Sequence, residues 1–161
     1  MTAELRRLEQ QLQTTFTAAA WHGPALLELL DGVTAEQAAA RPIPGAHTIW
    51  ELVLHLGGAY GLVVRRLRGD ARPLSAEEDW PGGATGSAAD WNEAVASLRQ
   101  LNAQVRRALA AFPADRLDEP LVPTSPYTAY AHFIGLTQHD LYHAGQIALL
   151  KRALAGSDRA R

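Results

Sequence analysis

The sequence predicts an all-α protein built as a four-helix bundle. Four long segments carry apolar residues at helical spacing, and no segment shows the sustained alternation of a β-strand. Stretches rich in proline and glycine separate the helical segments. The chain has 161 residues, of which 47% are hydrophobic, so a single domain over residues 1–161 has room for a sizeable core.

The first helical segment is expected to begin near Thr2 and to stop at the Asp-Gly pair at 31–32. Its apolar face starts with Leu5, Leu8, Leu12 and Phe16. Pro24 lies inside this segment. Because proline removes a backbone donor and clashes with the preceding turn, we expect a kink or a short break near Gly23.

Two capping boxes predict helix starts in the next part of the chain. Thr34 and Gln37 have the spacing of a capping box and predict a single helical turn. Thr48 and Glu51 form a stronger capping box and begin the second long helix, which runs to about Arg68. Its apolar positions are Val53, Leu56, Tyr60, Val64 and Leu67.

Residues 69–86 form a long connection that is rich in proline, glycine and acidic residues. Short loops force antiparallel neighbours, whereas a connection of this length can cross the end of the bundle and leave the second and third helices parallel. The third helix is capped by Ser87 or Asp90, and Pro113 ends it.

The fourth helix follows a second loop over residues 114–124. Ser125 followed by Pro126 is the expected start, because proline is favoured at the first helical position. The helix should run to about Leu154, and the tail over residues 156–161 is expected to fray.

Charge and composition narrow the classes of function. The formal net charge is −2, so there is no basic surface field, which argues against nucleic acid as the main partner. The chain has no cysteine, which excludes a disulfide framework, a thiolate metal site and a cysteine nucleophile. There is no apolar signal-peptide core and no run of membrane-spanning length. These features predict a cytoplasmic protein without a membrane partner.

His139 and His143 are the most informative pair of residues in the chain. Four residues are slightly more than one helical turn, so both imidazoles leave the same face of the predicted helix. That is the spacing at which a helix offers two nitrogen ligands to one metal ion. The alternative is two hydrogen-bonded histidines on a helix flank. The pair lies in an otherwise apolar helix, however, and buried imidazoles need partners, which a metal supplies.

The segment around this pair departs from the HExxH motif of zinc proteases. Asp140 stands where the glutamate base belongs, and its shorter side chain would not place a carboxylate on a metal-bound water in the same way. A metalloprotease is therefore not favoured. We expect Asp140 either to face away from the histidine pair or to orient a histidine ring from outside the set of metal ligands.

His55 supplies a third imidazole, on or near the core-facing stripe of the second helix. Three imidazoles from two helices would leave one to three coordination positions for water or substrate, as catalytic metal sites do. Glu51, four residues earlier, could accept the second ring proton of His55. The favoured interpretation is that Glu51 serves only the capping box.

Other residues are candidates for the pocket around such a site. His132 lies two turns before the histidine pair, too far to bind the same ion but able to line the pocket. His22 could line the pocket or be an ordinary hydrogen-bonded histidine. Tyr142 could donate to a substrate or pack in the core. Gln146 could bond to a ligand or to a neighbouring carbonyl group. His47, in a loop before a helix cap, is interpreted as an ordinary polar residue.

Glycine and tryptophan positions give further expectations. Gly145 inside a helix costs roughly 1 kcal/mol relative to alanine, which predicts the close approach of another helix. The acidic and aromatic residues 77–80 could cap the pocket or only cover the end of the bundle. Trp21 and Trp91 are interpreted as core residues.

Residues 44–56 (Pro-Gly-Ala-His-Thr-Ile-Trp-Glu-Leu-Val-Leu-His-Leu) and 135–147 (Gly-Leu-Thr-Gln-His-Asp-Leu-Tyr-His-Ala-Gly-Gln-Ile) carry a resemblance to a known family. In their order and wide separation they resemble the DinB family, the DinB/YfiT-like metalloenzymes, over nearly the whole chain. The resemblance implies a bundle in up-down-down-up order with a long crossover between helices two and three. It also implies a homodimer.

The resemblance further implies one divalent metal ion at positions matching His55, His139 and His143. Nickel or zinc is expected first, with manganese and iron as alternatives. Many family members have no established reaction. Some relatives are S-transferases that use the thiols bacillithiol or mycothiol, and a related isomerase uses mycothiol.

Three functions follow as hypotheses. In the first, a low-molecular-weight thiol binds at an open metal position, the cation lowers the thiol pKa, and the thiolate attacks an electrophilic small molecule. In the second, the ion activates water for hydrolysis. In the third, the protein is a non-catalytic, stress-related bundle that binds metal. Three imidazoles without a fourth protein ligand argue mildly against a purely structural site, because such sites are usually closed.

Overall fold

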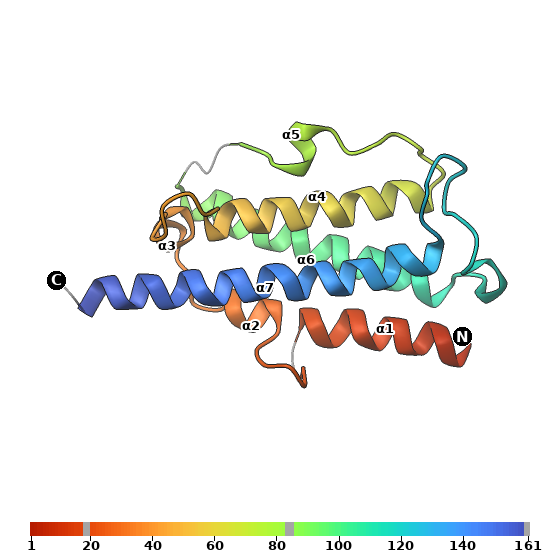
Figure 1. The fold of residues 1–161 in the computed structure, drawn as a ribbon, viewed down its shortest axis with the longest axis horizontal. Helices are drawn as coiled ribbons and strands as arrows, with labels where there is room; N and C mark the ends of the chain where they lie inside the picture. The colour runs from red at the N-terminus through yellow and green to blue at the C-terminus, as the bar shows by residue number, and fades with distance from the viewer. Residues whose placement is uncertain (18–19, 83–85, 160–161) are drawn as a thin grey trace.

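The computed structural model describes residues 1–17, 20–82 and 86–159, the last three by their backbone alone. Within these ranges every regular element is a helix, which confirms the predicted all-α class. The only β-type pairing among them is an isolated bridge between Pro120 and Thr128. The four longer helices are α1 (Ala3–Phe16), α4 (Ile49–Leu67), α6 (Ala88–Ala110) and α7 (Ala129–Arg159) (Figure 1).

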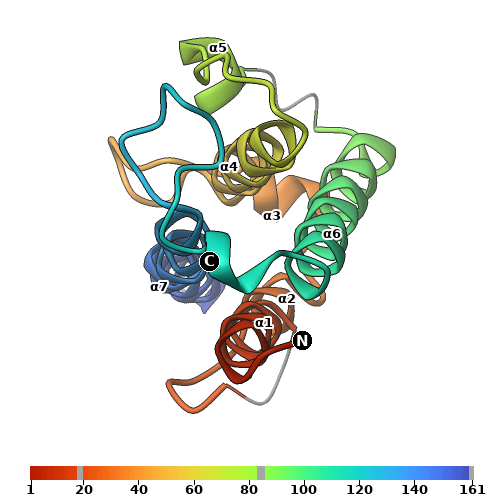
Figure 2. The same ribbon diagram turned by 90° about the vertical axis from the view of Figure 1, so that its right-hand side faces the viewer.

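These four helices surround a shared core, as the end-on view in Figure 2 shows. In Figure 1, α4 and α6 run toward the right-hand end of the molecule, and α1 and α7 run toward the left. α4 packs mainly against α6, and α1 packs mainly against α7. The largest fully buried side chains include Phe16, Tyr60 and Phe133, contributed by α1, α4 and α7.

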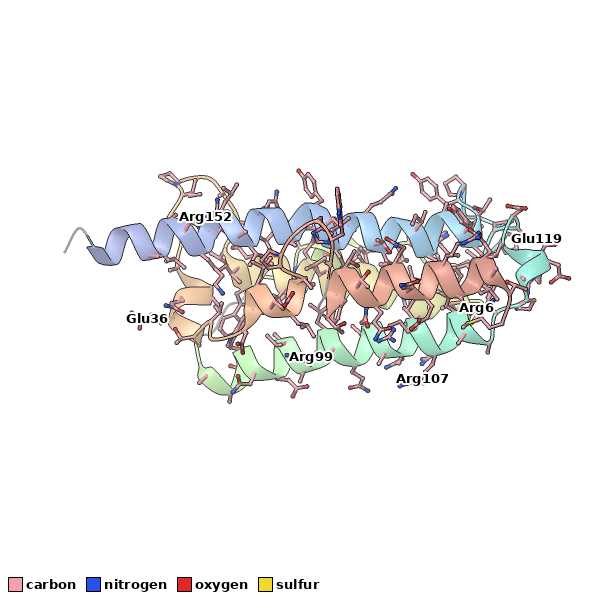
Figure 3. The ribbon with its side chains drawn as sticks, turned by 90° about the horizontal axis from the view of Figure 1, so that it is seen from below. Arg6, Glu36, Arg99, Arg107, Glu119 and Arg152 are labelled. Carbon is pink, nitrogen blue, oxygen red and sulfur yellow. The ribbon has the colours of Figure 1, made fainter. Side chains whose placement is uncertain are left out.

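Three short helices and one 3₁₀ turn complete the described structure. They are α2 (Leu26–Leu30), α3 (Ala35–Ala39), α5 (Ala76–Asp79) and η1 (Ala114–Arg116). Charged side chains such as those of Arg99, Arg107 and Arg152 project from the outer surface of the bundle (Figure 3). Among the described helices, none combines the length and apolar character needed to cross a bilayer.

Both predicted capping boxes are present. The Thr34 hydroxyl accepts from the Gln37 N–H while the Gln37 side chain accepts from the Thr34 N–H, and α3 begins there. Thr48 and Glu51 make the same reciprocal pair at the start of α4. Each box satisfies two backbone donors that the first turn of a helix leaves free, so each helix begins at the position that the sequence predicts.

The first helical segment is broken rather than kinked. α1 ends at Phe16 and α2 begins at Leu26, so the break surrounds Pro24 as expected, although residues 18–19 lie outside the described residues. The core interpretation of Trp21 is wrong, since this side chain is fully exposed. Trp21 lies in the break between α1 and α2, where no helix holds it against the core. Trp91 does lie in the core, where its Nε1 donates to the Val33 carbonyl at 2.8 Å.

The fourth long helix begins later and ends later than predicted. The Ser125 hydroxyl bonds to backbone groups of Tyr127, forming a local turn instead of a helix cap. The Thr128 hydroxyl accepts from the Ala131 N–H, and α7 begins at Ala129. α7 continues to Arg159, because neither proline nor a capping motif interrupts the backbone after Leu154. Residues 160–161 of the tail lie outside the described structure.

The connection between α4 and α6 lies along α4 for part of its length, where it carries α5 (Figure 1). Gly58 of α4 makes this approach possible, since a Cβ atom there would lie 2.4 Å from the Glu78 carbonyl oxygen. Arg65, two turns along α4, binds the Glu78 carboxylate at 2.5 Å. Glycine and this ion pair together hold the α5 segment against α4.

Candidate metal centre

Three histidines from two helices converge beside the α5 segment. His55 lies on α4, and His139 and His143 lie one turn apart on α7. The Nε2 atom of His139 is 3.0 Å from Nε2 of His55 and 3.0 Å from Nε2 of His143. One ligand atom from each ring lies within 4.8 Å of the others. The structure therefore brings together the three residues that the sequence singled out.

In two of these rings, hydrogen bonds at Nδ1, the nitrogen that points away from the centre, determine which nitrogen carries the proton. Nδ1 of His55 lies 2.7 Å from the main-chain carbonyl of Asp79 and 3.1 Å from its carboxylate. Nδ1 of His143 lies 2.6 Å from the Gln146 side-chain oxygen. Because a carbonyl oxygen can only accept, both Nδ1 atoms are donors, and in the neutral rings both Nε2 atoms carry lone pairs.

The third ring is held differently. Nδ1 of His139 is buried and has no hydrogen-bond partner among the described residues. Burial, together with the neighbouring rings of His143 and His55, lowers the pKa of His139 to about 4. Burial also lowers the pKa of His143, against the opposing effect of its bond to Gln146. His139 and His143 are therefore neutral at neutral pH.

These observations test whether the residues fit a divalent metal ion. The Nε2 atoms of His55 and His143 present lone pairs, and His139 has at most one proton to share between them at 3.0 Å. A cation satisfies all three nitrogens at once. A separation of 3.0 Å between these nitrogens is short enough for each to reach the same ion at about 2.1 Å. The donor set therefore fits a divalent ion that prefers imidazole, and further positions stay open for other ligands.

Trp80, directly after α5, covers this centre. Its ring stacks on His55 with centroids 3.9 Å apart and planes at 5°. It also stacks on His47 at 3.8 Å and 13°. Of the two predicted roles for residues 77–80, the structure thus shows the capping one, with Asp79 bonded to a histidine and Trp80 packed over it. His47, interpreted as an ordinary polar residue, is in fact part of this stack.

Glu51 does not contact His55 in the way that the sequence allowed. Its carboxylate serves the capping box with Thr48, as favoured, and also binds Arg41 at 2.6 Å and Nδ1 of His47 at 3.2 Å. The place predicted for Glu51, behind His55, is taken by Asp79. No local pattern could have indicated Asp79, because it lies 24 residues further along the chain.

Two other histidines lie away from the centre. His132 is buried, but its Nδ1 donates to the Thr128 carbonyl at 2.8 Å and its Nε2 accepts from Arg66. It joins helix α7 to α4 and does not contact the three converging rings. His22 is exposed in the turn before α2. The pocket role suggested for these two residues has no support in their surroundings.

Asp140 faces away from the histidine pair and into the core. It is 1% exposed and accepts a hydrogen bond of 2.6 Å from the Tyr60 hydroxyl, which in turn accepts one of 3.0 Å from Asn102. Burial raises the pKa of Asp140 to about 7, although the bond from Tyr60 opposes the rise. This buried chain joins α4, α6 and α7 one residue away from His139.

The remaining predicted residues lie at the edge of the centre. Tyr142 is 66% exposed and meets the His143 ring edge-on at 5.0 Å, so the core-packing alternative is wrong. The Gln146 side-chain oxygen accepts from His143, a contact that neither of the two roles expected for Gln146 described. Gly145 is exposed, and a Cβ atom there would meet nothing within 4 Å. The predicted helix approach at Gly145 is wrong, and Gly58 is the glycine that permits one.

A cavity of about 300 Å³ adjoins the centre. It lies between the loop before α4 and the middle of α7, and it is lined by Ile43, His47, Leu52, Gln146, Leu149 and Leu150. Two of these residues connect the cavity to the converging histidines. Gln146 bonds to His143, and His47 stacks on the Trp80 ring, which in turn stacks on His55. The arrangement places an apolar hollow beside the three histidines that could hold a metal ion.

The fold and the site define a class of helical bundle in which a group of three histidines could hold a metal ion. Residues 18–147 match the family model of the DinB superfamily, which covers most of the chain. The protein belongs to the DinB superfamily, as the motifs around His55 and His139 predicted. No curated protein and no solved structure matches the chain.

Proposed function

We propose that this protein is a metal-dependent S-transferase, which joins a low-molecular-weight thiol of the bacillithiol or mycothiol type to an electrophilic small molecule. The observation that carries the proposal is the convergence of the Nε2 atoms of His55, His139 and His143. Their lone pairs suit one divalent ion, with nickel or zinc expected first. Three protein ligands leave positions for a thiol, which distinguishes the arrangement from a closed structural site.

The thiol nucleophile must come from a second substrate, because the chain has no cysteine. A divalent cation at the centre supplies positive charge that lowers the pKa of a thiol and favours the thiolate at neutral pH. A bond then forms between the thiolate sulfur and the electrophilic carbon while the bond from that carbon to its leaving group breaks. The thiol proton departs with the leaving group.

The residues around the centre have roles in orientation and in limiting water access. The Asp79 carbonyl and the Gln146 side chain hold the rings of His55 and His143 by their outer nitrogens. Such partners fix the ring orientation and raise the basicity of a metal ligand. Trp80 covers one side of His55 and keeps bulk water from it. The exposed ring of Tyr142 meets the His143 ring edge-on, with centroids 5.0 Å apart.

The first test is the metal content of protein purified without an affinity tag. Plasma mass spectrometry should find about one nickel or zinc ion per chain, and none in a folded His55→Ala/His139→Ala/His143→Ala variant. His132→Ala is the matched control, since this buried histidine lies outside the centre, and it should keep the ion. Absence of metal, together with no uptake of nickel, zinc or manganese, would overturn the proposal.

Turnover assays then identify the reaction. Thiol-dependent consumption of an aromatic halide by the metal-loaded protein, lost in the triple variant, supports S-transfer. Ester or amide cleavage without a thiol would instead support the hydrolase alternative. A centre that binds metal but catalyses neither reaction would leave a non-catalytic metal-binding bundle.

The homodimer implied by the family resemblance is also part of the proposal. Light scattering coupled to size-exclusion chromatography measures the mass in solution directly. A mass of two chains supports the homodimer, and a mass of one chain at micromolar concentration contradicts it.

A further inference from the structure

The cavity beside the metal centre has the chemistry of a binding site for an uncharged, largely apolar molecule. Four aliphatic side chains line it, those of Ile43, Leu52, Leu149 and Leu150. Two of them keep substantial contact with solvent, since Leu149 is 58% exposed and Ile43 is 38% exposed. Aliphatic surface that stays wet in a hollow is surface that a ligand can cover with a gain in free energy.

Two polar groups lie at the edge of this apolar hollow. Glu51 accepts from Nδ1 of His47, and Nε2 of His47 has no partner among the described residues. The side-chain oxygen of Gln146 is occupied by His143, whereas its amide NH₂ donates to no described residue. His47 and Gln146 therefore give the lining one imidazole nitrogen and one amide NH₂ group without a partner among the described residues, while the other side chains that line it are aliphatic.

The position of His47 is fixed by its neighbours. Its ring stacks on Trp80, and its Nδ1 lies 3.2 Å from the Glu51 carboxylate, which Arg41 and the Thr48 N–H also hold. A side chain that is restrained on two sides gives up little conformational freedom when a ligand binds. His47 is therefore a prearranged part of the wall, although its side chain is half exposed.

Size and polarity identify the occupant. The volume of about 300 Å³ is twice that of an engineered apolar cavity of about 150 Å³ that holds benzene. It therefore suits an aromatic or branched aliphatic body with a short polar head. A sugar-based thiol carries too many hydroxyl and carboxylate groups for an aliphatic wall, because burying them without partners is unfavourable.

We propose that this cavity binds the apolar body of the electrophilic substrate beside the metal centre, and that Leu149 and Ile43 determine which bodies fit. The inference rests on the proposed function for the identity of the electrophile. Binding in the cavity itself needs no metal ion, because none of the lining residues is one of the three converging histidines. The cavity and the metal centre can therefore be tested separately.

The test uses naphthalene-1-carboxamide, an uncharged aromatic amide with no group that reacts with thiols. Its affinity is measured by protein-observed NMR titration of metal-free protein. Leu149→Arg places a charge in the cavity from an exposed position and should raise the Kd by about tenfold or more. Ile43→Arg on the opposite wall should have the same effect. Tyr130→Arg is the matched control, an exposed aromatic residue on the same helix outside the cavity, and should leave the Kd unchanged.

Each outcome decides one point. Binding that Leu149→Arg and Ile43→Arg weaken but Tyr130→Arg does not, and that persists in the triple histidine variant, supports the inference even if the protein takes up no metal. No binding, or equal weakening by all three arginine variants, overturns the inference, whatever the metal analysis shows. Chemical shift changes that centre on residues away from α7 and the loop before α4 also overturn it.

Discussion

Replacing Gly58 with alanine should weaken metal binding without unfolding the protein. A Cβ atom at this position would lie 2.4 Å from the Glu78 carbonyl oxygen, whereas Cβ contacts in real structures stay beyond 3.0 Å. The backbone of α5 must then move away from α4 by about 0.6 Å or more. The same backbone carries the Asp79 carbonyl that holds His55.

The movement acts on a hydrogen bond of known length. Nδ1 of His55 lies 2.7 Å from the Asp79 carbonyl oxygen, and a displacement of this size lengthens the contact to about 3.3 Å, beyond the range of a good hydrogen bond. Losing a partner of this kind costs about 10–100-fold in metal affinity. Because the bond is weakened and not removed, we expect the Kd for zinc to rise about tenfold, the lower end of that range.

Gly61→Ala is the matched control on the same helix, since a Cβ atom there meets nothing within 4 Å. It should leave the zinc Kd unchanged and raise the free energy of unfolding by about 1 kcal/mol through helix propensity. Competition against a chromophoric chelator measures the Kd, and urea unfolding measures stability. Equal zinc affinity of the Gly58→Ala and Gly61→Ala proteins would show that the α5 backbone does not support zinc binding.

Three further outcomes are expected. Zinc affinity should fall as the pH falls toward the His139 pKa of about 4, because protons then compete for its nitrogen; a zinc affinity that stays unchanged from neutral pH down to that value would contradict this. His139 should make the metal-free protein less stable as the pH falls from 6.5 toward 4, since the unfolded chain binds protons there that the folded His139 does not, while the raised pKa of Asp140 acts in the opposite sense; a His139→Ala protein whose urea midpoint changes with pH as the wild-type midpoint does would argue against this role of His139. Tyr60→Phe should lower the free energy of unfolding by about 1–3 kcal/mol, because the buried Asp140 carboxylate loses its donor, and urea midpoints equal to wild type would exclude that role.

The sequence predicted the helices and the converging histidines because both depend on local spacing. The pair at His139 and His143 follows from the helical period, and the position of His55 follows from the apolar stripe of its helix. The capping boxes were equally reliable, since a cap involves groups only three residues apart. The family resemblance rested on the same short segments.

The parts that the sequence could not predict depend on contacts between distant residues. Asp79 and Trp80 reach the centre only because α5 lies on α4 at Gly58, and no periodicity indicates that contact. The same limit explains the errors at Trp21 and Gly145. Trp21 was assigned to the core and Gly145 to a helix contact from the residue type alone, but Trp21 is exposed in the break between α1 and α2 and Gly145 lies on the solvent side of α7.

The partner of His55 is a main-chain carbonyl, and this has a consequence for transferring the centre into another protein. Any amino acid at position 79 supplies a carbonyl group, so this closer contact of 2.7 Å does not depend on the residue type there, whereas the contact of 3.1 Å with the Asp79 carboxylate does. What must be copied is the path of the backbone, which depends on the missing side chain at Gly58. Grafting only the three histidines onto another bundle would therefore reproduce the imidazoles but omit the backbone carbonyl that orients the His55 ring.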